Sequence, residues 1–381
     1  MKRTLFTAEH EAFRAMIRDF VAREVVPNYT EWEAAGHAPR GIFQRLGELG
    51  VMGMNMPAKY GGSGENYVFN VVLQEETARV GVVIGALRTH LDVILPYFRR
   101  YADQAQRERW FPGICRGELL TAIAMTEPDT GSDLAAVRTS AVLDGDCYVL
   151  NGAKTYITGG HLADLVIVLA RTSAAVENRR DGLTLLVVED GQPGFEKGRK
   201  LDKIGLTAQD TVELSFQDVR VPAANRLGED GRGFYYLGAN LPQERLAIAV
   251  GAVSQARAAV EHTVEHAKNR NLFGQPLSAF QNTKFELAAM SAEVEAAQAM
   301  LDQAVAELVA GELSSADAAR VKLFCTEMQG RVVDRALQLF GGFGYIRESL
   351  IGRLYADARV SRIYGGTSEV MKSIISKSMG L

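Results

Sequence analysis

The sequence predicts an α+β fold in which a helical domain, a domain of antiparallel strands and a second helical domain follow one another. Apolar residues recur at spacings of three and four up to about residue 117, as in amphipathic helices. The pattern changes to alternation over about residues 118–230, and the helical spacing returns from residue 231. We therefore expect three domains, at residues 1–117, 118–230 and 231–381.

The amino-terminal domain is expected to consist of amphipathic helices. Apolar pairs recur at helical spacing over residues 12–25, and Pro27 closes the segment. Further helical patterns cover residues 42–49 and 67–80. The glycine-rich segment 57–64 between them predicts a flexible loop.

The central domain is expected to be an antiparallel sheet or β-barrel. Alternating residues 137–143, a turn at residues 144–146 and a return run from Tyr148 predict a hairpin. Further strand-like runs cover residues 165–169, 183–188, 212–216 and 219–222. The segments between these runs show no helices of about ten residues, which parallel strands would need as crossovers.

The carboxyl-terminal domain is expected to be a four-helix bundle. Residues 231–381 are long enough for four or five long helices. Ser314 followed by Asp317 predicts a helix start, and apolar residues then repeat at helical spacing from Val321 to Leu339.

Composition excludes several classes of protein. With 42 Lys and Arg against 46 Asp and Glu, the chain has no positive excess for nucleic acid. The longest apolar run, residues 164–170, is far shorter than the roughly 18 residues of a membrane span, and no targeting peptide is visible. Three dispersed cysteines predict a reduced, cytoplasmic location, and no metal site is expected because His262 and His266 lack a third ligand nearby.

Four glycine-rich segments allow both a functional and a structural interpretation. Residues 125–133 offer hydroxyl groups and a tight turn whose N–H groups could face an anion, or form a plain turn. Residues 154–160 place Tyr156 and Thr158 on one face of a strand, where they could pack on a flat ring or end a hairpin. Residues 338–344 either cap a helix or leave room for a ligand. Residues 362–370 place a helix N-terminus where its free amides could meet an anion or carbonyl oxygen.

Glu244 is the candidate catalytic carboxylate. It interrupts an apolar helical pattern and shares a helix face with Ala247, Ile248 and Gly251. It either forms an ion pair with Arg245 or a neighbour, or faces a cavity, and the residues alone favour the ion pair.

Together these segments resemble signatures of the acyl-CoA dehydrogenase family, over essentially the whole chain. The similar segments are 124–133 (AMTEPDTGSD), 338–345 (QLFGGFGY), 364–369 (YGGTSE) and 270–274 (RNLFG), with Gln281 beyond. The resemblance implies an amino-terminal helical domain, a central β-barrel and a carboxyl-terminal four-helix bundle. That order agrees with the one derived from the hydrophobic patterns.

The resemblance also implies bound FAD, held noncovalently between barrel and bundle. The matching positions place Met125, Thr126 and Ser132 at the flavin ring and pyrophosphate, and Tyr156, Ile157 and Thr158 beside the ring near N5. Positions expected to touch the cofactor of an adjacent subunit are Arg270, Phe273, Gln281, Gln338, Leu339, Gly341 and Gly342, while Thr367 and Glu369 match the adenosine and phosphate end. Such a site needs at least a dimer, and the family usually forms a homotetramer.

The position of the base is implied by a departure from the common pattern. Many members carry the catalytic glutamate in a Tyr-Glu-Gly-Thr motif, but Gly365 stands in that slot here. Long-chain and isovaleryl-CoA dehydrogenases place the base on a bundle helix. The long-chain type pairs a PQERL run with YGGT, and this chain has both, at residues 242–246 and 364–367. The resemblance therefore points to Glu244.

The implied activity is FAD-dependent α,β-dehydrogenation of an acyl-CoA thioester to the trans-2-enoyl-CoA, as in fatty acid β-oxidation. Glu244 would remove the α proton while flavin N5 accepts a hydride. Gly365 or Gly366 would bind the thioester oxygen, with Ser132, Arg245 and Tyr364 near the substrate, and an electron-transfer flavoprotein would accept the electrons. Two alternatives stay open: a dehydrogenase of acyl groups on a carrier protein in secondary metabolism, and a catalytically silent oligomeric flavoprotein.

Overall fold

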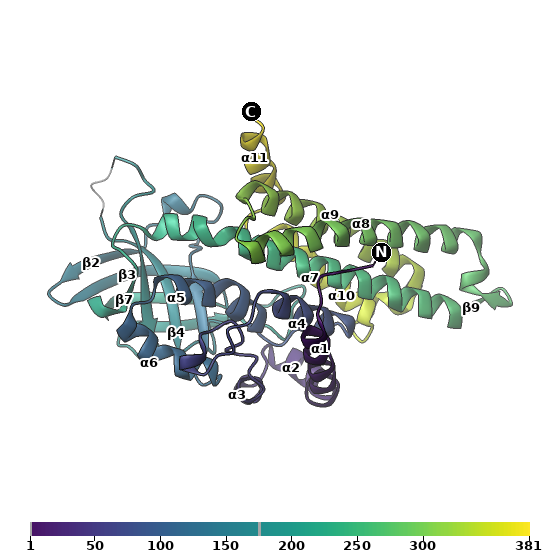
Figure 1. The fold of residues 1–381 in the computed structure, drawn as a ribbon, viewed down its shortest axis with the longest axis horizontal. Helices are drawn as coiled ribbons and strands as arrows, with labels where there is room; N and C mark the ends of the chain where they lie inside the picture. The colour runs from purple at the N-terminus through teal and green to yellow at the C-terminus, as the bar shows by residue number, and fades with distance from the viewer. Residues whose placement is uncertain (1, 174–176) are drawn as a thin grey trace.

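The computed structural model describes residues 2–173 and 177–381. A strand region lies at one end of the molecule and the long carboxyl-terminal helices extend to the other, with the amino-terminal helices packed beside both (Figure 1). The order of helices, strands and helices that the hydrophobic patterns predict is confirmed.

The amino-terminal region consists of six α-helices. They are α1 (Ala8–Phe20), α2 (Tyr29–Ala35), α3 (Arg40–Glu48), α4 (Val68–Arg79), α5 (Leu95–Tyr101) and α6 (Gln104–Cys115), with the π-helical turn η4 (Thr89–Ile94) leading into α5. Helix α4 is buried on nearly all sides because it packs between α1 and the long helix α7 (Gly233–Asn269). Through α4, the amino-terminal helices and the bundle share a packed boundary.

The central region is one eight-stranded sheet. Its strands are β1 (Thr121–Ala124), β2 (Ser140–Asp144), β3 (Cys147–Thr158), β4 (Leu165–Arg171), β5 (Leu183–Glu189), β6 (Phe195–Lys200), β7 (Thr211–Pro222) and β8 (Arg226–Leu227). They pair in the order β6-β7-β3-β2-β4-β5-β8, with β1 beside β4. Because β5 also contacts β7, the sheet curves around an apolar interior.

Pairing is mainly antiparallel, with one correction to the prediction. The β2–β3 hairpin forms around the predicted turn and pairs Leu143 with Tyr148. However, β1 runs parallel to β4, and β2 meets β4 in parallel at a single pair, Ser140 with Arg171. The predicted antiparallel sheet is therefore confirmed except for this parallel pairing, for which the β2–β3 hairpin, lying between β1 and β4 in the chain, serves as the crossover.

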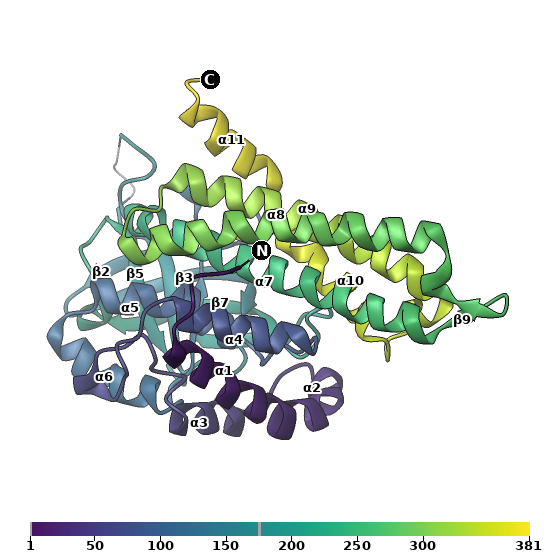
Figure 2. The same cartoon turned by 45° about the vertical axis from the view of Figure 1, so that its right-hand side comes forward.

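The carboxyl-terminal region is helical. After α7 come α8 (Gln281–Ala310), α9 (Ser315–Phe340), α10 (Leu350–Ala358) and α11 (Ser368–Ser378), and the small hairpin β9 (Asn271–Leu272)–β10 (Gln275–Pro276) joins α7 to α8. As predicted, α9 begins after Ser314, whose Oγ accepts a hydrogen bond from the Asp317 N–H at 3.0 Å. Helices α7, α8 and α9 pack together and α10 covers α9 and α7, whereas α11 points away from the body (Figure 2).

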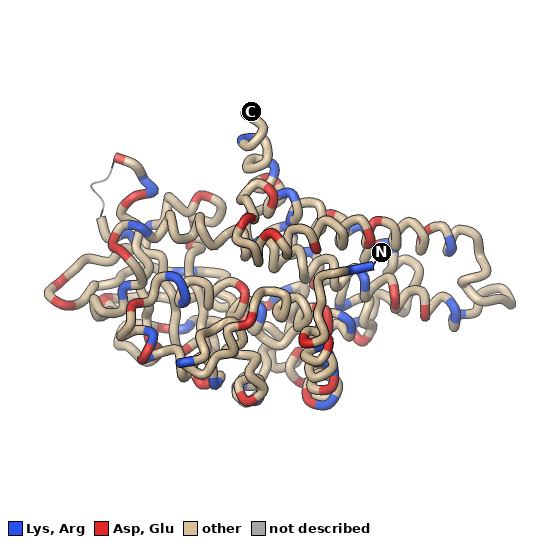
Figure 3. The backbone as a smooth tube through the Cα atoms, in the orientation of Figure 1, with Lys and Arg blue, Asp and Glu red and all other residues tan. Residues whose placement is uncertain are grey.

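Charges do not divide the surface into large regions of one sign. Basic and acidic residues are interspersed along the whole backbone (Figure 3). Within residues 2–173 and 177–381, no helix is both long and apolar enough to cross a membrane.

Candidate active site

Glu244 lies on α7, facing the amino-terminal helices. Only 4% of the residue is exposed, and its Oε1 accepts a hydrogen bond from the Tyr97 hydroxyl group of α5 at 2.8 Å. Burial raises the pKa of Glu244 to about 7, although the Tyr97 hydrogen bond and the charge of Arg245 oppose this shift. The carboxyl group can therefore gain or lose a proton near neutral pH, as a general base must.

Polar contacts fix this turn of α7 against η4 and α5. Pro242 lies inside the helix, where it lacks the N–H that would donate to the preceding turn. In the same turn, Arg100 Nη1 donates to the Ala239 carbonyl oxygen at 3.0 Å, and Gln243 Nε2 donates to the Asp92 carbonyl oxygen at 3.0 Å. Together with the hydrogen bond between Tyr97 and Glu244, these contacts hold the carboxylate in place.

Arg245 does not neutralise Glu244. Its Nη1 donates to Ser315 Oγ at 3.2 Å, at the start of α9, and its buried Nε has no hydrogen-bond partner. No ion pair joins these two described side chains, so the ion pair that the residues alone favoured is a wrong prediction. The reason is geometric, because adjacent helix positions point about 100° apart.

The loop at residues 364–366 packs against the same part of α7. Gly365 and Gly366 have φ values of 63° and 93°, which only glycine adopts readily. A Cβ atom on Gly365 would lie 2.4 Å from Ile248 Cδ1, one helical turn beyond Glu244. Lys322 Nζ donates to the Gly366 carbonyl oxygen, which holds the loop on α9.

The two glycine-rich segments of the sheet region meet each other. The Thr155 N–H donates to the Thr126 carbonyl oxygen at 3.0 Å. The buried Lys154 Nζ donates to the Met125 carbonyl oxygen at 3.0 Å and pairs with Glu127 Oε1 at 2.9 Å. The loop after β1 is therefore fastened to the end of β3.

This surface suits a flat, polar ring system. Tyr156 is 68% exposed and has a φ of 59°, at an irregularity in the β3–β7 pairing. No hydrogen bond of the Thr126, Ser132 or Thr158 hydroxyl groups occurs within the described part of the chain, so all three can bind a ligand. The side chain of Ile157 packs inside the sheet instead. An exposed aromatic ring beside free hydroxyl groups fits the stacking and hydrogen bonding that a flavin requires.

The positions expected to reach a neighbouring subunit gather at the far end of the bundle. Arg270 and Phe273 belong to the β9–β10 hairpin region, and Gln281 starts α8 (Figure 1). Phe273 is 95% exposed. The ring of His266 stacks on that of Phe340, with centroids 4.0 Å apart, which brings the end of α7 beside the segment that contains Gln338, Leu339, Gly341 and Gly342.

Thr367 and Glu369 lie at the start of α11. The Thr367 hydroxyl group accepts a hydrogen bond from the Val370 N–H at 3.3 Å and so caps the helix. Glu369 is exposed in the first turn. The β9–β10 hairpin at the bundle end lies far from the sheet within one chain (Figure 1).

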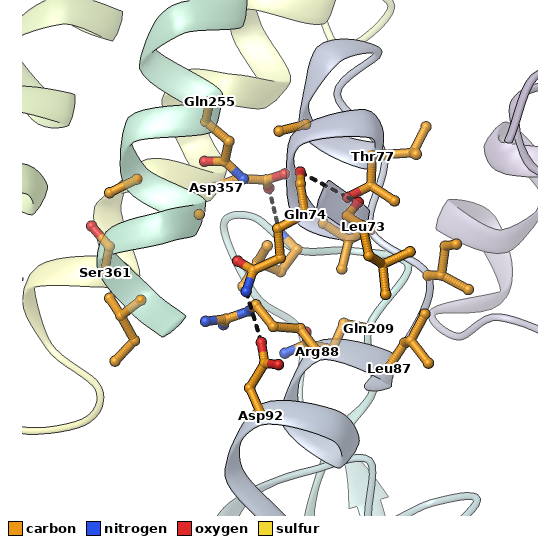
Figure 4. A pocket seen from close by; sticks show the side chains of 18 of the residues that line it. Leu73, Gln74, Thr77, Leu87, Arg88, Asp92, Gln209, Gln255, Asp357 and Ser361 are labelled. Carbon is orange, nitrogen blue, oxygen red and sulfur yellow. Dashed lines mark hydrogen bonds between the residues drawn. The ribbon is translucent and has the colours of Figure 1, made fainter. Parts of the chain in front are cut away.

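A pocket with a cavity volume of about 80 Å³ opens between α4, η4 and α7 (Figure 4). Ile248 and Gly251, on the helix face of Glu244, line its wall, as does Tyr364. Arg88 points into the pocket and donates through Nη2 to the Tyr364 hydroxyl group at 2.9 Å. The pocket therefore begins beside the Gly365 loop.

Three residues of this site were not predicted: Tyr97, Arg88 and Asp92. Tyr97 belongs to no motif and lies 147 residues from Glu244 in the chain. Arg88 and Asp92 did leave a signal, because they interrupt the apolar stretch 82–95 at a spacing that places both on one side of a helix.

Comparisons with known proteins agree with this geometry. Models of the acyl-CoA dehydrogenase N-terminal, middle and C-terminal domains match residues 7–118, 122–219 and 231–380. The mitochondrial long-chain specific acyl-CoA dehydrogenase of Sus scrofa is 41% identical over 99% of this chain and 88% of its own length. The mitochondrial isovaleryl-CoA dehydrogenase of Pongo abelii is 34% identical over 97% and 88%.

Solved structures show the same relationship. An acyl-CoA dehydrogenase from Geobacillus kaustophilus superimposes with a TM-score of 0.97, at 43% identity over 100% of both chains. A chain in the structure of the electron transferring flavoprotein of Acidaminococcus fermentans gives 0.92, at 30% identity over 98% of both. The prolyl acyl carrier protein oxidase AnaB gives 0.90, at 28% identity over 99% of this chain and 100% of AnaB.

Fold, site and comparisons together define a flavin-dependent oxidoreductase. The chain belongs to the acyl-CoA dehydrogenase family, whose members are FAD-dependent flavoproteins. The family, the fold class and the FAD cofactor that the motifs implied are confirmed.

Proposed function

We propose that the enzyme catalyses α,β-dehydrogenation of an acyl-CoA and that Glu244 is the base that removes the α proton. The observation that supports this proposal is the environment of the Glu244 carboxyl group. It is buried, it has no ion pair among the described residues, and it shares a helix face with Ile248 and Gly251 of the pocket wall. A carboxylate in such surroundings is a stronger base than one in water.

The remaining roles follow from the positions of the chain's own groups. Met125, Thr126, Ser132, Tyr156 and Thr158 would hold the FAD ring region, with Ile157 packed inside the sheet beneath them, and bound FAD would supply the hydride acceptor. The backbone of Gly365 or Gly366 would donate to the thioester oxygen and so stabilise the negative charge that develops as Glu244 takes the proton. Tyr364 lines the substrate pocket, whereas the contact of Arg245 with Ser315 gives it a positioning role.

We further propose a homotetramer in which each flavin touches two chains. The residues that would meet the cofactor of a neighbouring subunit are Arg270, Phe273, Gln281, Gln338, Leu339, Gly341 and Gly342. Thr367 and Glu369 would lie at the adenosine and phosphate end of the FAD. The exposure of Phe273 supports this proposal, because 95% of a large apolar residue faces solvent in the single chain.

The substrate and electron acceptor are proposed from relatives. Acyl-CoA as substrate follows from the long-chain and isovaleryl-CoA relatives, and an electron-transfer flavoprotein in the cytoplasm is the proposed acceptor. The similarity to AnaB supports carrier-protein-bound acyl groups as the second candidate. Comparing flavin bleaching by acyl-CoA with bleaching by the same acyl group on a carrier protein distinguishes the two.

The role of Glu244 is tested by Glu244→Gln. This change keeps the shape of the side chain but removes its basicity, so we expect bound FAD to be retained and flavin reduction by acyl-CoA to fall by about 10²–10⁴-fold. The measurement is anaerobic stopped-flow absorbance of the flavin. Glu261→Gln, at an exposed position of the same helix, is the matched control and should reduce flavin normally. Substantial flavin reduction by the Glu244 variant would refute the assignment.

A further inference from the structure

The wall of the pocket beside the Gly365 loop combines apolar and polar residues. The apolar residues of the wall are Leu73, Ala78, Val82, Val83, Ile84, Leu87, Leu91, Leu206, Ile248 and Ala252. The wall also contains the polar residues Asn70, Gln74, Arg88, Asp92, Gln209, Gln255, Gln329, Asp357, Ser361 and Tyr364. Several of these polar groups are already paired within the protein, because Gln329 Nε2 donates to Gln255 Oε1 at 2.6 Å and Ser361 Oγ donates to Gln329 Oε1 at 2.9 Å. Polar recognition of a ligand therefore depends on a wall residue that still has unused donors.

Arg88 is the group in this pocket with the most unused hydrogen-bonding capacity. A guanidinium group has five N–H donors, and the hydrogen bond to Tyr364 uses one of them. No ion pair of Arg88 occurs within residues 2–173 and 177–381. The nearby Asp92 is already engaged, because Asn70 Nδ2 donates to its Oδ1 at 2.5 Å and Gln74 Nε2 donates to its Oδ2 at 2.7 Å. Arg88 thus faces the cavity with donors available to a ligand (Figure 4).

The other charged residues of the pocket wall determine which hydrogen-bond acceptor on a substrate Arg88 can bind favourably. Asp92 and Asp357 both line the pocket, and burial raises the pKa of each to about 6, so both are largely ionised at neutral pH. A substrate carboxylate would be attracted by Arg88 but repelled by these two aspartates. A hydroxyl or carbonyl oxygen accepts the same hydrogen bonds without that repulsion.

We infer that the preferred substrate carries a neutral oxygen function on its acyl chain, beyond the β carbon, and that Arg88 binds this oxygen. This inference rests on the proposed dehydrogenase function and names its substrate class. Arg88 acts here as a specificity residue, since it lies in the pocket wall and not beside Glu244.

The test compares acyl-CoAs of matched length. For chains of four to ten carbons, kcat/KM is measured for the plain acyl-CoA, the ω-hydroxyacyl-CoA and the ω-carboxyacyl-CoA. We expect the hydroxyacyl-CoA to be preferred over the plain one by about tenfold or more at one or more lengths, the effect of one hydrogen bond to a charged group. Arg88→Met should reduce this preference ratio by about the same factor, and Arg88→Lys should keep part of it. Arg99→Met makes the same change at an exposed arginine outside the pocket wall and should leave the ratio unchanged.

The outcomes separate this inference from the proposed function. If plain acyl-CoAs are oxidised in a Glu244-dependent manner and preferred at every length, the inference is wrong and the proposed function stands. Preference for the ω-carboxyacyl series, or a ratio that Arg88→Met does not change, also overturns it. If no acyl-CoA reduces the flavin of the wild-type enzyme, the proposed function fails and the inference fails with it.

Discussion

At the scale of single residues, the proposed role of Glu244 as base means that the Glu244–Tyr97 pair sets the pH dependence of the reaction. The carboxyl group is neutral below its pKa of about 7 and can accept the α proton only once it is ionised. The rate constant for flavin reduction at limiting substrate should therefore rise as pH increases through 7 and level off above it. Stopped-flow measurements across pH 5.5–9 test whether the rate constant rises in this way. An exposed carboxylate has a lower pKa and would give no rise near pH 7.

Tyr97→Phe isolates the contribution of the hydrogen bond. The Tyr97 hydroxyl group stabilises the ionised form of Glu244, so its removal should raise the pKa of Glu244 further and shift the rising limb to higher pH. Tyr101→Phe is the matched control, because Tyr101 stacks on Tyr236 and makes no hydrogen bond to Glu244. If the rising part of the pH–rate profile stays in place or moves to lower pH, the Tyr97 hydrogen bond does not lower the pKa of Glu244.

Prediction from sequence reached some residues of the site and not others. Glu244 could be predicted as the base because the PQERL run and the YGGT motif are local patterns that resemble those of long-chain members of the family. Tyr97 could not be predicted, because its hydrogen bond to Glu244 depends on how α5 packs against α7. The wrong ion pair with Arg245 has the same origin, since sequence adjacency says nothing about the Ser315 hydroxyl group that Arg245 meets.

At the scale of elements, the loop at residues 364–366 and helix α7 fit each other closely. Gly365→Ala would force a Cβ atom to 2.4 Å from Ile248 Cδ1 at a φ of 63°. We expect it to destabilise the enzyme by about 1–3 kcal/mol and to slow flavin reduction. Gly238→Ala, inside α7 with nothing within 4 Å of the new Cβ, should instead stabilise by up to about 1 kcal/mol. Urea unfolding of both variants measures the sign of the change in the free energy of unfolding. Equal changes in the two variants would contradict this explanation.

The long helices and the apolar strands were predictable because their periodic patterns extend over many residues. Short elements were not. Strand β1 has four residues, and β6 is mostly polar, so neither shows a clear alternation. The parallel β1–β4 pair escaped prediction because its crossover is a hairpin and not a helix.

At the scale of the whole molecule, the β9–β10 hairpin that carries Phe273 lies at the opposite end from the sheet that carries Tyr156 (Figure 1). If both contact flavin, a complete site needs two chains. Phe273→Ser should therefore lower the retained FAD and weaken the oligomer without changing the fold of the subunit, as measured by flavin content and light scattering. Val142→Ser, exposed on β2 at the sheet end, is the control and should behave as wild type. Normal flavin content in the Phe273 variant would argue against the shared site.

Helix α7 carries Glu244 near its beginning and leads directly into Arg270 at its end, a separation of roughly 40 Å at 1.5 Å per residue. Each polypeptide would then provide proton abstraction to its own active centre and cofactor contacts to another. Two inactive variants, Glu244→Gln and Phe273→Ser, should consequently complement each other when co-expressed. In a hybrid pair, one active site has an intact Glu244 from its own chain and an intact Phe273 from the neighbouring chain, whereas the other site has both substituted residues. The hybrid should therefore regain about half of the wild-type turnover per pair.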